Sequence, residues 1–285
     1  MRDPVPAPIN IARIVTPLAQ TLSLRTLPLH AHEILPAFAF YNFLNLYVSP
    51  TISSKLARRT YPDLPERSRI NWDAHVVSLV QSTFINTAAL WVIWSDRERW
   101  EMSAVQRVWG YTGSMGMVQA CSAGYFLWDL ISASLRPDVH GYGAIAHAAA
   151  AVAISMLGFR PFCNYYGINF VLYELSTPFL NFHWFMDKLD MTGSTAQLIN
   201  GIALLVTFGG SRLVWGTYQN VKMYSDIWEA FNTQGGLPVP TWLAGVYMLA
   251  SGTLTGLNLF WFSKMIQALL ARFQDDKKSD QKKKR

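Results

Sequence analysis

Charged residues are scarce in this chain. Asp, Glu, Lys and Arg make up 15% of its 285 residues, whereas a soluble globular domain carries about 25%. Hydrophobic residues reach 51% and aromatic residues 14%. This balance excludes an ordinary soluble domain and indicates helices that contact lipid.

The sequence also lacks the signatures of several other classes. Its net charge is +6, but the basic residues stand at helix ends and in the tail, whereas a nucleic-acid reader carries them along a folded face. The only two cysteines, Cys121 and Cys163, lie in apolar segments and form neither a disulfide framework nor a metal-binding spacing. The N-terminus MRDPVPAPIN has no continuous apolar run and therefore predicts no cleaved signal peptide. Nucleotide-binding, zinc-protease and serine-hydrolase motifs are missing, so we predict no bound cofactor and no metal.

Long apolar stretches are what the sequence does contain. A spanning helix needs about 17–25 mostly apolar residues. Seven stretches qualify, near 33–53, 74–94, 110–134, 142–158, 162–183, 196–218 and 241–264. The first is interrupted by Pro36 and Pro50, the fourth is short, and 219–240 is the longest later loop. We therefore predict an all-α, polytopic membrane protein with about seven transmembrane helices.

The distribution of basic residues predicts the orientation. If the C-terminus is cytosolic, 15 of the 24 Lys and Arg residues fall on the cytosolic side, as the positive-inside rule expects. The chain ends in Lys282, Lys283, Lys284 and Arg285, and lysines at the third and fourth places from the end resemble a dilysine retrieval signal, which is an address rather than an anchor. The alternative is a solvated basic tail that touches anionic lipid.

Ionisable residues at bilayer depth are costly and mark functional sites. Asp129, His147 and Glu174 fall in spans three, four and five. At 1.5 Å per residue they lie about 8, 8 and 13 Å inside the cytosolic boundary. This shared depth favours a lipid-facing polar cavity. In the alternative interpretation the carboxyl groups are protonated structural residues and His147 is a packing residue among alanines.

The stretch YELSTPFLNFHWF, from residue 173 to 185, surrounds one of these carboxyl groups. Asn181 is seven residues from Glu174 and should share its helix face. Pro178 should kink the helix, and Ser176 can help to satisfy the freed carbonyl groups. Arg212 falls near the far end of span six and is expected to snorkel to the interface.

Two stretches carry a family resemblance. GYFLWDLISASL, and AIAHAAAAVAISMLGFRPFCNYYGINFVLYELSTPFLNFHWFMDKL after it, resemble the TLC domain, which ceramide synthases, translocation-associated membrane proteins and several small TLC-domain proteins share. The resemblance covers roughly 70–270. It implies a six-helix barrel in the endoplasmic reticulum membrane with an internal lipid tunnel, so we predict an N-terminal segment with the first span and a basic loop (1–69), a TLC domain (70–270) and a disordered basic tail (271–285).

The same resemblance suggests the site. In the ceramide-synthase branch a His-His pair and a His-Asp-x-x-Asp stretch carry the catalytic residues. An ungapped overlay places the pair on Ala146 and His147, and the later His-Asp on Tyr173 and Glu174, with Asn181 in place of an acid. One histidine of the pair is thus missing. Our catalytic candidates are His147, Glu174 and Asp129, and our lipid-binding candidates are Asn181, Tyr173, Asn169, Ser176 and Pro178.

Three functions remain open at this level. The first is a multi-pass protein of the endoplasmic reticulum that binds lipid in its helix bundle and takes part in lipid homeostasis. The second is an acyl-CoA-dependent N-acyltransferase of ceramide-synthase type, for which acyl-CoA would be a co-substrate. The third is a lipid transporter. The expected partners are sphingolipids or phospholipids with their acyl groups and, through the tail, the coat machinery, but no nucleic acid. The sequence leaves open which lipid is bound, whether the site is catalytic, and the oligomeric state.

Overall fold

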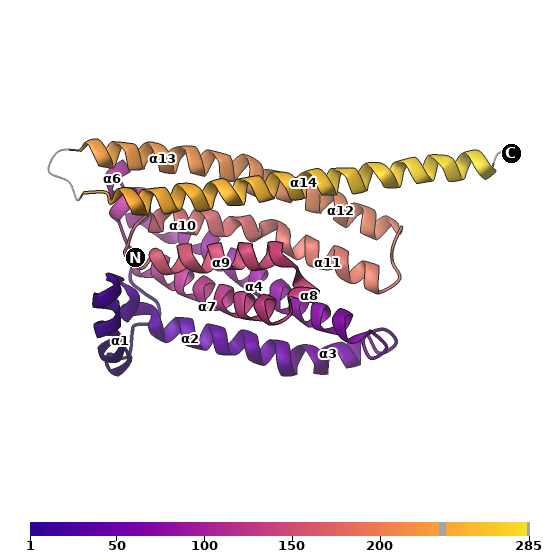
Figure 1. The fold of residues 1–285 in the computed structure, drawn as a ribbon, viewed down its shortest axis with the longest axis horizontal. Coiled ribbons are helices and arrows are strands. Elements are labelled where there is room, and N and C mark those ends of the chain that lie inside the picture. The colour runs from indigo at the N-terminus through magenta and orange to yellow at the C-terminus, as the bar shows by residue number, and fades with distance from the viewer. Residues whose placement is uncertain (234–237, 284–285) are drawn as a thin grey trace.

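Seven helical rods run side by side along the long axis of the molecule (Figure 1). They are seen in a computed structural model that describes the backbone of residues 1–233 and 238–283, and side chains as far as residue 271. Each rod corresponds to one of the seven predicted apolar stretches. The chain starts at one end of the bundle, and α14 leaves the bundle at the opposite end.

Some rods are single helices and others are shorter helices joined end to end. The single helices are α4 (Glu66–Ser95), α7 (Gly113–Leu135), α9 (Tyr142–Leu157) and α14 (Thr241–Lys283). The first composite rod joins α2 (Leu27–Phe43), the π-helical η1 (Leu44–Val48) and α3 (Ser49–Leu56). The second joins α10 (Asn164–Val171), the 3₁₀-helical η2 (Leu172–Ser176) and α11 (Thr177–Lys188). The third joins α12 (Thr195–Phe208), the π-helical η3 (Gly209–Trp215) and α13 (Gly216–Asn232).

Among the described residues, three continuous helical segments are long and apolar enough by themselves to cross a bilayer. They are Glu66–Ser95, Thr195–Asn232 and Thr241–Ala271. The helix Tyr142–Leu157 is apolar but shorter. Of the other rods, α7 is a single helix of 23 residues, whereas the two that contain Pro50 and Pro178 reach their full length only by joining shorter helices, as prolines lead one to expect.

In the described part of the chain, four short helices lie outside the rods. They are α1 (Ile9–Leu22), α5 (Arg97–Trp100), α6 (Ala104–Trp109) and α8 (Pro137–His140). The first of them lies across the end of the bundle (Figure 1). It ends at Ser23, which has a left-handed backbone with φ 57°. Ile14 and Leu18 on α1 are exposed, as expected for an amphipathic helix in the plane of an interface.

Local sequence explains where the rods begin and where one of them changes geometry. Thr112 accepts a hydrogen bond from the backbone N–H of Met115 and caps α7, and Ser194 caps α12 through Gln197 N–H, as hydroxyl residues do at helix N-termini. Pro178 stands in the first turn of α11, directly after the 3₁₀ turn η2. The predicted irregularity of the fifth span is therefore confirmed.

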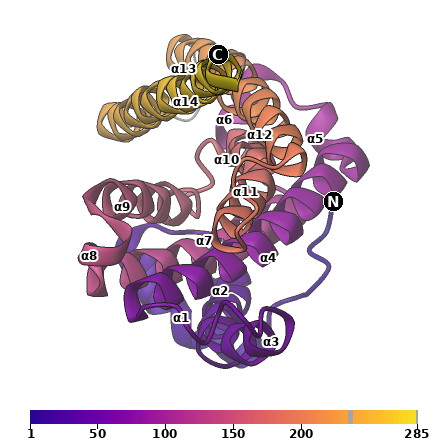
Figure 2. The same ribbon diagram turned by 90° about the vertical axis from the view of Figure 1, so that its right-hand side faces the viewer.

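Six rods form the barrel, and the first rod packs on its outside. Figure 2 shows α2 and α3 beside α7 and away from α14. Four buried apolar clusters hold the bundle together, and the largest of them joins α10, α13 and the start of α14 through Tyr166, Met223 and Leu243. The predicted all-α membrane barrel with an additional N-terminal span is confirmed.

Two expectations about the loops differ from the structure. The segment 219–240 was expected to be a loop, but α13 continues as a helix to Asn232, because its residues after Gly216 contain neither glycine nor proline. The tail from residue 271 was expected to be disordered, but the backbone of α14 is helical to Lys283. That stretch also lacks glycine and proline, and lysine is a good helix former.

Candidate functional site

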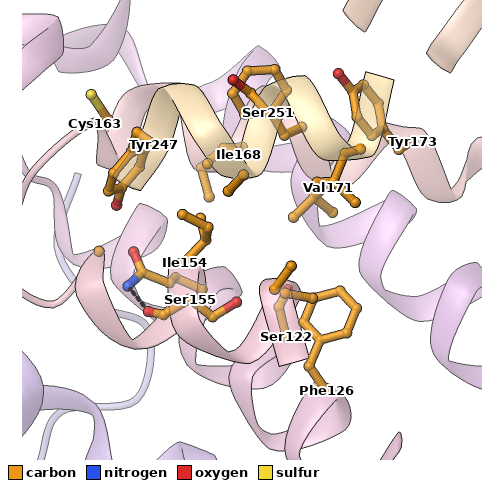
Figure 3. A pocket seen from close by; sticks show the side chains of 18 of the residues that line it. Ser122, Phe126, Ile154, Ser155, Cys163, Ile168, Val171, Tyr173, Tyr247 and Ser251 are labelled. Atoms are coloured by element: carbon orange, nitrogen blue, oxygen red, sulfur yellow. Dashed lines mark hydrogen bonds between the residues drawn. The ribbon is translucent and has the colours of Figure 1, made fainter. Parts of the chain in front are cut away.

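A cavity of about 140 Å³ lies inside the bundle between α4, α7, α9, α10, η2, α13 and α14. Most of its lining is apolar. Figure 3 shows Tyr247 and Ser251 of α14 on one side of it, and Ile154 and Ser155 of α9 on the other. The lining extends along α9 from His147 to Gly158, a distance of about 17 Å at the rise of an α-helix. The cavity is therefore elongated parallel to the helices.

Two of the three predicted catalytic residues line this cavity. His147 projects from α9, and Glu174 comes from η2. The His147 ring makes edge contacts with Phe126 and Trp261, at centroid distances of 6.3 and 6.1 Å. Its Nδ1 is buried and has no hydrogen-bond partner among the described residues. Asp129 on α7 is not part of the lining, so the structure brings His147 and Glu174 to one cavity and leaves Asp129 outside it.

Arg212 is the main residue that the sequence analysis placed incorrectly. Its side chain is only 9% exposed, and its Nη2 lies 3.6 Å from Glu174 Oε1. The guanidinium also donates to the Tyr173 carbonyl oxygen (3.0 Å), to Asn258 Oδ1 (3.3 Å) and to Thr177 Oγ1 (3.3 Å). Arg212 does not snorkel to the interface, because these contacts hold its buried guanidinium between the helices. In the sequence, the signal for this pair was one acidic and one basic residue in neighbouring spans, neither with another residue of opposite charge in its own span.

Of the predicted lipid-binding residues, only Tyr173 lines the cavity. Asn181 is buried between helices, where its Oδ1 lies 2.7 Å from His75 Nδ1 and its Nδ2 donates to Ser78 Oγ at 3.1 Å. The His75 ring stacks on Trp184 with a centroid distance of 4.2 Å. Through these contacts His75 joins α4 to α11. This polar group connects two rods and does not face the cavity.

Of the remaining predicted residues, Asn169 connects helices and Ser176 bonds within its own element. Asn169 accepts a hydrogen bond from Arg99, and its Nδ2 donates to Gln219 Oε1 at 2.8 Å. Ser176 Oγ donates to the Tyr173 carbonyl oxygen at 3.4 Å, as predicted for a hydroxyl beside Pro178. Neither Ser176 nor Pro178 belongs to the cavity lining.

The sequence analysis missed polar residues at the end of the cavity farther from His147. Gln119 donates from Nε2 to the Ser155 carbonyl oxygen at 2.7 Å and accepts from Asn164 Nδ2. Tyr247 donates to the Phe162 carbonyl oxygen at 3.0 Å. Their signal in the sequence is weak, because single amides and hydroxyls in apolar helices are also common in helix packing.

The predicted retrieval signal lies at the edge of the described chain. The backbone of α14 reaches Lys283. The side chains of Lys282 and Lys283, and all of residues 284–285, lie outside the described residues.

Apolar rods that are long enough to cross a bilayer, buried charges between them and an internal cavity together define a polytopic helical membrane protein. A family model described as the TLC domain matches residues 71–267. The chain therefore belongs to the TLC-domain family, as the resemblance predicted.

Several relatives support this assignment. The chain is 39% identical to an uncharacterised TLC domain-containing protein of Schizosaccharomyces pombe, across 95% of this chain and 90% of the relative. It is 29% identical to topoisomerase I damage affected protein 4 of Saccharomyces cerevisiae, across 84% of each chain. Human TLC domain-containing protein 4 is 24% identical across 80% of this chain and 85% of the relative.

Proposed function

We propose that this chain is a multi-pass protein of the endoplasmic reticulum membrane that binds a membrane lipid in the cavity and contributes to lipid homeostasis. The observation that supports this most strongly is the composition of the cavity. Apolar side chains such as Ile154, Val171 and Leu254 form most of the wall. Polar residues stand toward both ends, with His147 and Glu174 at one end and Gln119 and Tyr247 at the other. An elongated apolar space with polar groups at its ends suits an acyl chain whose headgroup lies at one end.

The charged and polar groups at the His147 end of the cavity limit which headgroups fit. Glu174 is paired with Arg212, and the His147 imidazole has an unsatisfied nitrogen. A hydroxyl, amide or amine group could donate to that nitrogen, or a hydroxyl could accept from it. The His147 end therefore favours a lipid whose headgroup region is neutral and forms hydrogen bonds, such as a sphingolipid backbone. A lipid that presents only hydrocarbon at this end is disfavoured.

Occupancy of the cavity can be tested by filling it. Ala150 and Ala151 of α9 line the cavity, whereas Ala149 of the same helix is exposed and does not line it. Lipids would be extracted from detergent-purified wild type, Ala150→Phe, Ala151→Phe and the matched control Ala149→Phe, and quantified by mass spectrometry. We expect a stoichiometric lipid in the wild type and the control and little in the cavity variants. Equal lipid in all four proteins would contradict the proposal.

Location and orientation need separate tests. A reporter at the C-terminus should be accessible to protease in sealed microsomes, because we propose a cytosolic C-terminus. Replacing Lys282 and Lys283 with alanine should let the protein leave the endoplasmic reticulum if the coat machinery reads them. Unchanged retention of that double variant would favour the solvated-tail interpretation.

A second candidate function is N-acyl transfer, and the unpartnered His147 Nδ1 favours it. In that reaction the imidazole nitrogen attacks the carbonyl carbon of an acyl-CoA, the carbon–sulfur bond breaks and the thiol of coenzyme A leaves with a proton. An amine then attacks the acyl-imidazole, forms an amide, and gives up its proton as the imidazole is released. The cavity could hold the acyl chain throughout.

The two functions differ in one measurement. Intact-mass spectrometry after incubation with an acyl-CoA would show an acyl adduct on wild type that a long-chain amine removes, and none on His147→Ala. Absence of an adduct in wild type that still carries lipid would leave lipid binding as the function. A transporter would need a polar path through the bundle, and nothing in the cavity lining favours one.

A further inference from the structure

A second cluster of ionisable residues lies at the end of the bundle where the chain starts, away from the cavity. One ligand atom each from Asp3, His30 and Glu33 lies within 4.8 Å of the others. Asp3 comes from the segment before α1, and His30 and Glu33 come from successive turns of α2. His30 is fully buried and Glu33 is 8% exposed. We propose that these three residues form a binding site for a divalent transition-metal ion of the zinc type, although the sequence by itself predicted no metal.

The distances are close to those of a metal site. His30 Nδ1 lies 3.4 Å from Asp3 Oδ2 and 2.6 Å from Glu33 Oε2. Ligand atoms at about 2.0 Å from a tetrahedral zinc ion are about 3.3 Å apart. The first separation already has this value, and the second needs the Glu33 carboxylate to withdraw by about 0.7 Å. Rotation of a glutamate side chain is sufficient for such a movement.

The other nitrogen of His30 is arranged as in a metal-binding histidine. A histidine that binds metal through one ring nitrogen donates its other N–H to a fixed acceptor, which sets the ring orientation. His30 Nε2 is hydrogen-bonded to the hydroxyl of Tyr111. This contact leaves Nδ1 as the nitrogen that faces the two carboxylates.

An unsatisfied oxygen is the second, independent indication of a ligand. Glu33 Oε1 is buried and has no hydrogen-bond partner among the described residues. A buried carboxylate oxygen without a partner is costly, and a cation beside it would remove that cost. Within the cluster, two carboxylates and a neutral imidazole carry a charge of −2, which one divalent ion balances. A proton on His30 would balance only half of it.

The proposed ion would fasten the N-terminal segment to the bundle. That segment is already positioned by two backbone contacts, from His32 Nε2 to the Val5 carbonyl oxygen at 2.7 Å and from Gly113 N–H to the Met1 carbonyl oxygen at 3.0 Å. Asp3 therefore stays near His30 without the ion. The metal would add a link between the segment and α2 rather than create their contact.

The test is metal content together with thermal stability of the whole chain. Protein would be purified in detergent through a tag that contains no histidine, without chelator, and analysed by inductively coupled plasma mass spectrometry. We expect equimolar zinc in wild type and strong depletion in Asp3→Asn and His30→Gln. His140→Gln serves as the matched control, because His140 lies on α8, outside the cluster and outside the N-terminal segment; it should keep the metal.

A second measurement covers the case in which His30→Gln does not fold. Asp3 is partly exposed, with 15% of its side chain accessible, so Asp3→Asn should fold. Chelation should lower the melting temperature of wild type and ZnCl₂ should restore it, while Asp3→Asn should respond to neither. Wild type that contains no divalent metal and gains no stability from ZnCl₂ would overturn the proposal. Equal metal in wild type and both cluster variants would overturn it too, because the ion would then be adventitious.

Discussion

Replacing Arg212 with methionine should destabilise the protein more than any replacement of a surface arginine. Methionine keeps much of the side-chain volume but removes three hydrogen bonds and the 3.6 Å ion pair with Glu174. Hydrogen bonds between membrane helices average about 0.6 kcal/mol each, so three give about 2 kcal/mol. Truncating one partner of a buried ion pair costs about 3–5 kcal/mol. We therefore expect a loss of about 3 kcal/mol of unfolding free energy.

The assay is equilibrium unfolding in mixed micelles as the fraction of denaturing detergent rises. Four proteins form a double-mutant cycle: wild type, Arg212→Met, Glu174→Gln and the double variant. Because Arg212 and Glu174 interact directly, the double variant should lose at least about 1 kcal/mol less than the sum of the single losses. Arg67→Met is the matched control, since the Arg67 side chain is 65% exposed and surface pairs contribute about 0–1 kcal/mol. Additive losses, or an Arg212→Met variant as stable as the control, would refute the reasoning.

Three further predictions use other parts of the structure. Gly216→Ala would place a methyl group on the Tyr173 hydroxyl, so we expect about 1–3 kcal/mol of destabilisation and loss of bound lipid, whereas Gly210→Ala, whose new methyl group meets no atom within 4 Å, should leave lipid binding intact. Burial raises the pKa of Asp96, but hydrogen bonds from Thr112, Ser114 and the Met1 ammonium outweigh this effect and hold the pKa below its ordinary value of 3.8. Asp96 therefore stabilises the fold above about pH 4 and ceases to do so as the pH falls through its lowered pKa. In acid titrations followed by intrinsic fluorescence, Asp96→Asn should lose less stability below pH 4 than wild type does. An equal loss of stability below pH 4 in both proteins would count against this. Asp226→Asn should lower stability by about 2 kcal/mol, because Asp226 accepts charge-assisted hydrogen bonds from Arg107 as well as one from Tyr166. Unfolding of the variant at the same detergent fraction as wild type would show that this network contributes nothing.

The seven spans were predictable because hydropathy and helix length are properties of consecutive residues. Capping residues such as Thr112 and Ser194 mark two of the starts in the same local way. The prediction of where helices end was less successful. Residues 219–232 are polar enough to resemble a loop, yet tertiary packing of Met223 and Ile227 holds them in α13. Because this helix was predicted to end near residue 218, Arg212 was placed close to its end, whereas it lies near the middle of the helix Thr195–Asn232.

The site was predictable only in part. The depth of a residue along the membrane normal does not tell in which direction around the helix axis its side chain points. The shared depth of His147 and Glu174 correctly placed both in one region. Asn181 was expected on the same face as Glu174, but the seven residues between them also carry it about 10 Å farther along the rod. Glu174 is the last residue of this rod that lines the cavity, so Asn181 lies beyond the end of the cavity. It meets His75 instead of the cavity.

The shortness of α9 has a consequence for the surrounding bilayer. Its 16 residues span about 24 Å, against about 30 Å for the hydrocarbon core of an average membrane. The lipids next to this wall of the cavity must therefore compress, or the protein must favour a membrane whose core is already thin. The endoplasmic reticulum has such a membrane, at about 27 Å, and the plasma membrane does not. At the location proposed above, hydrophobic thickness would act in the same direction as the proposed retrieval signal. It would also bring compressed lipid tails to the wall behind which the cavity lies.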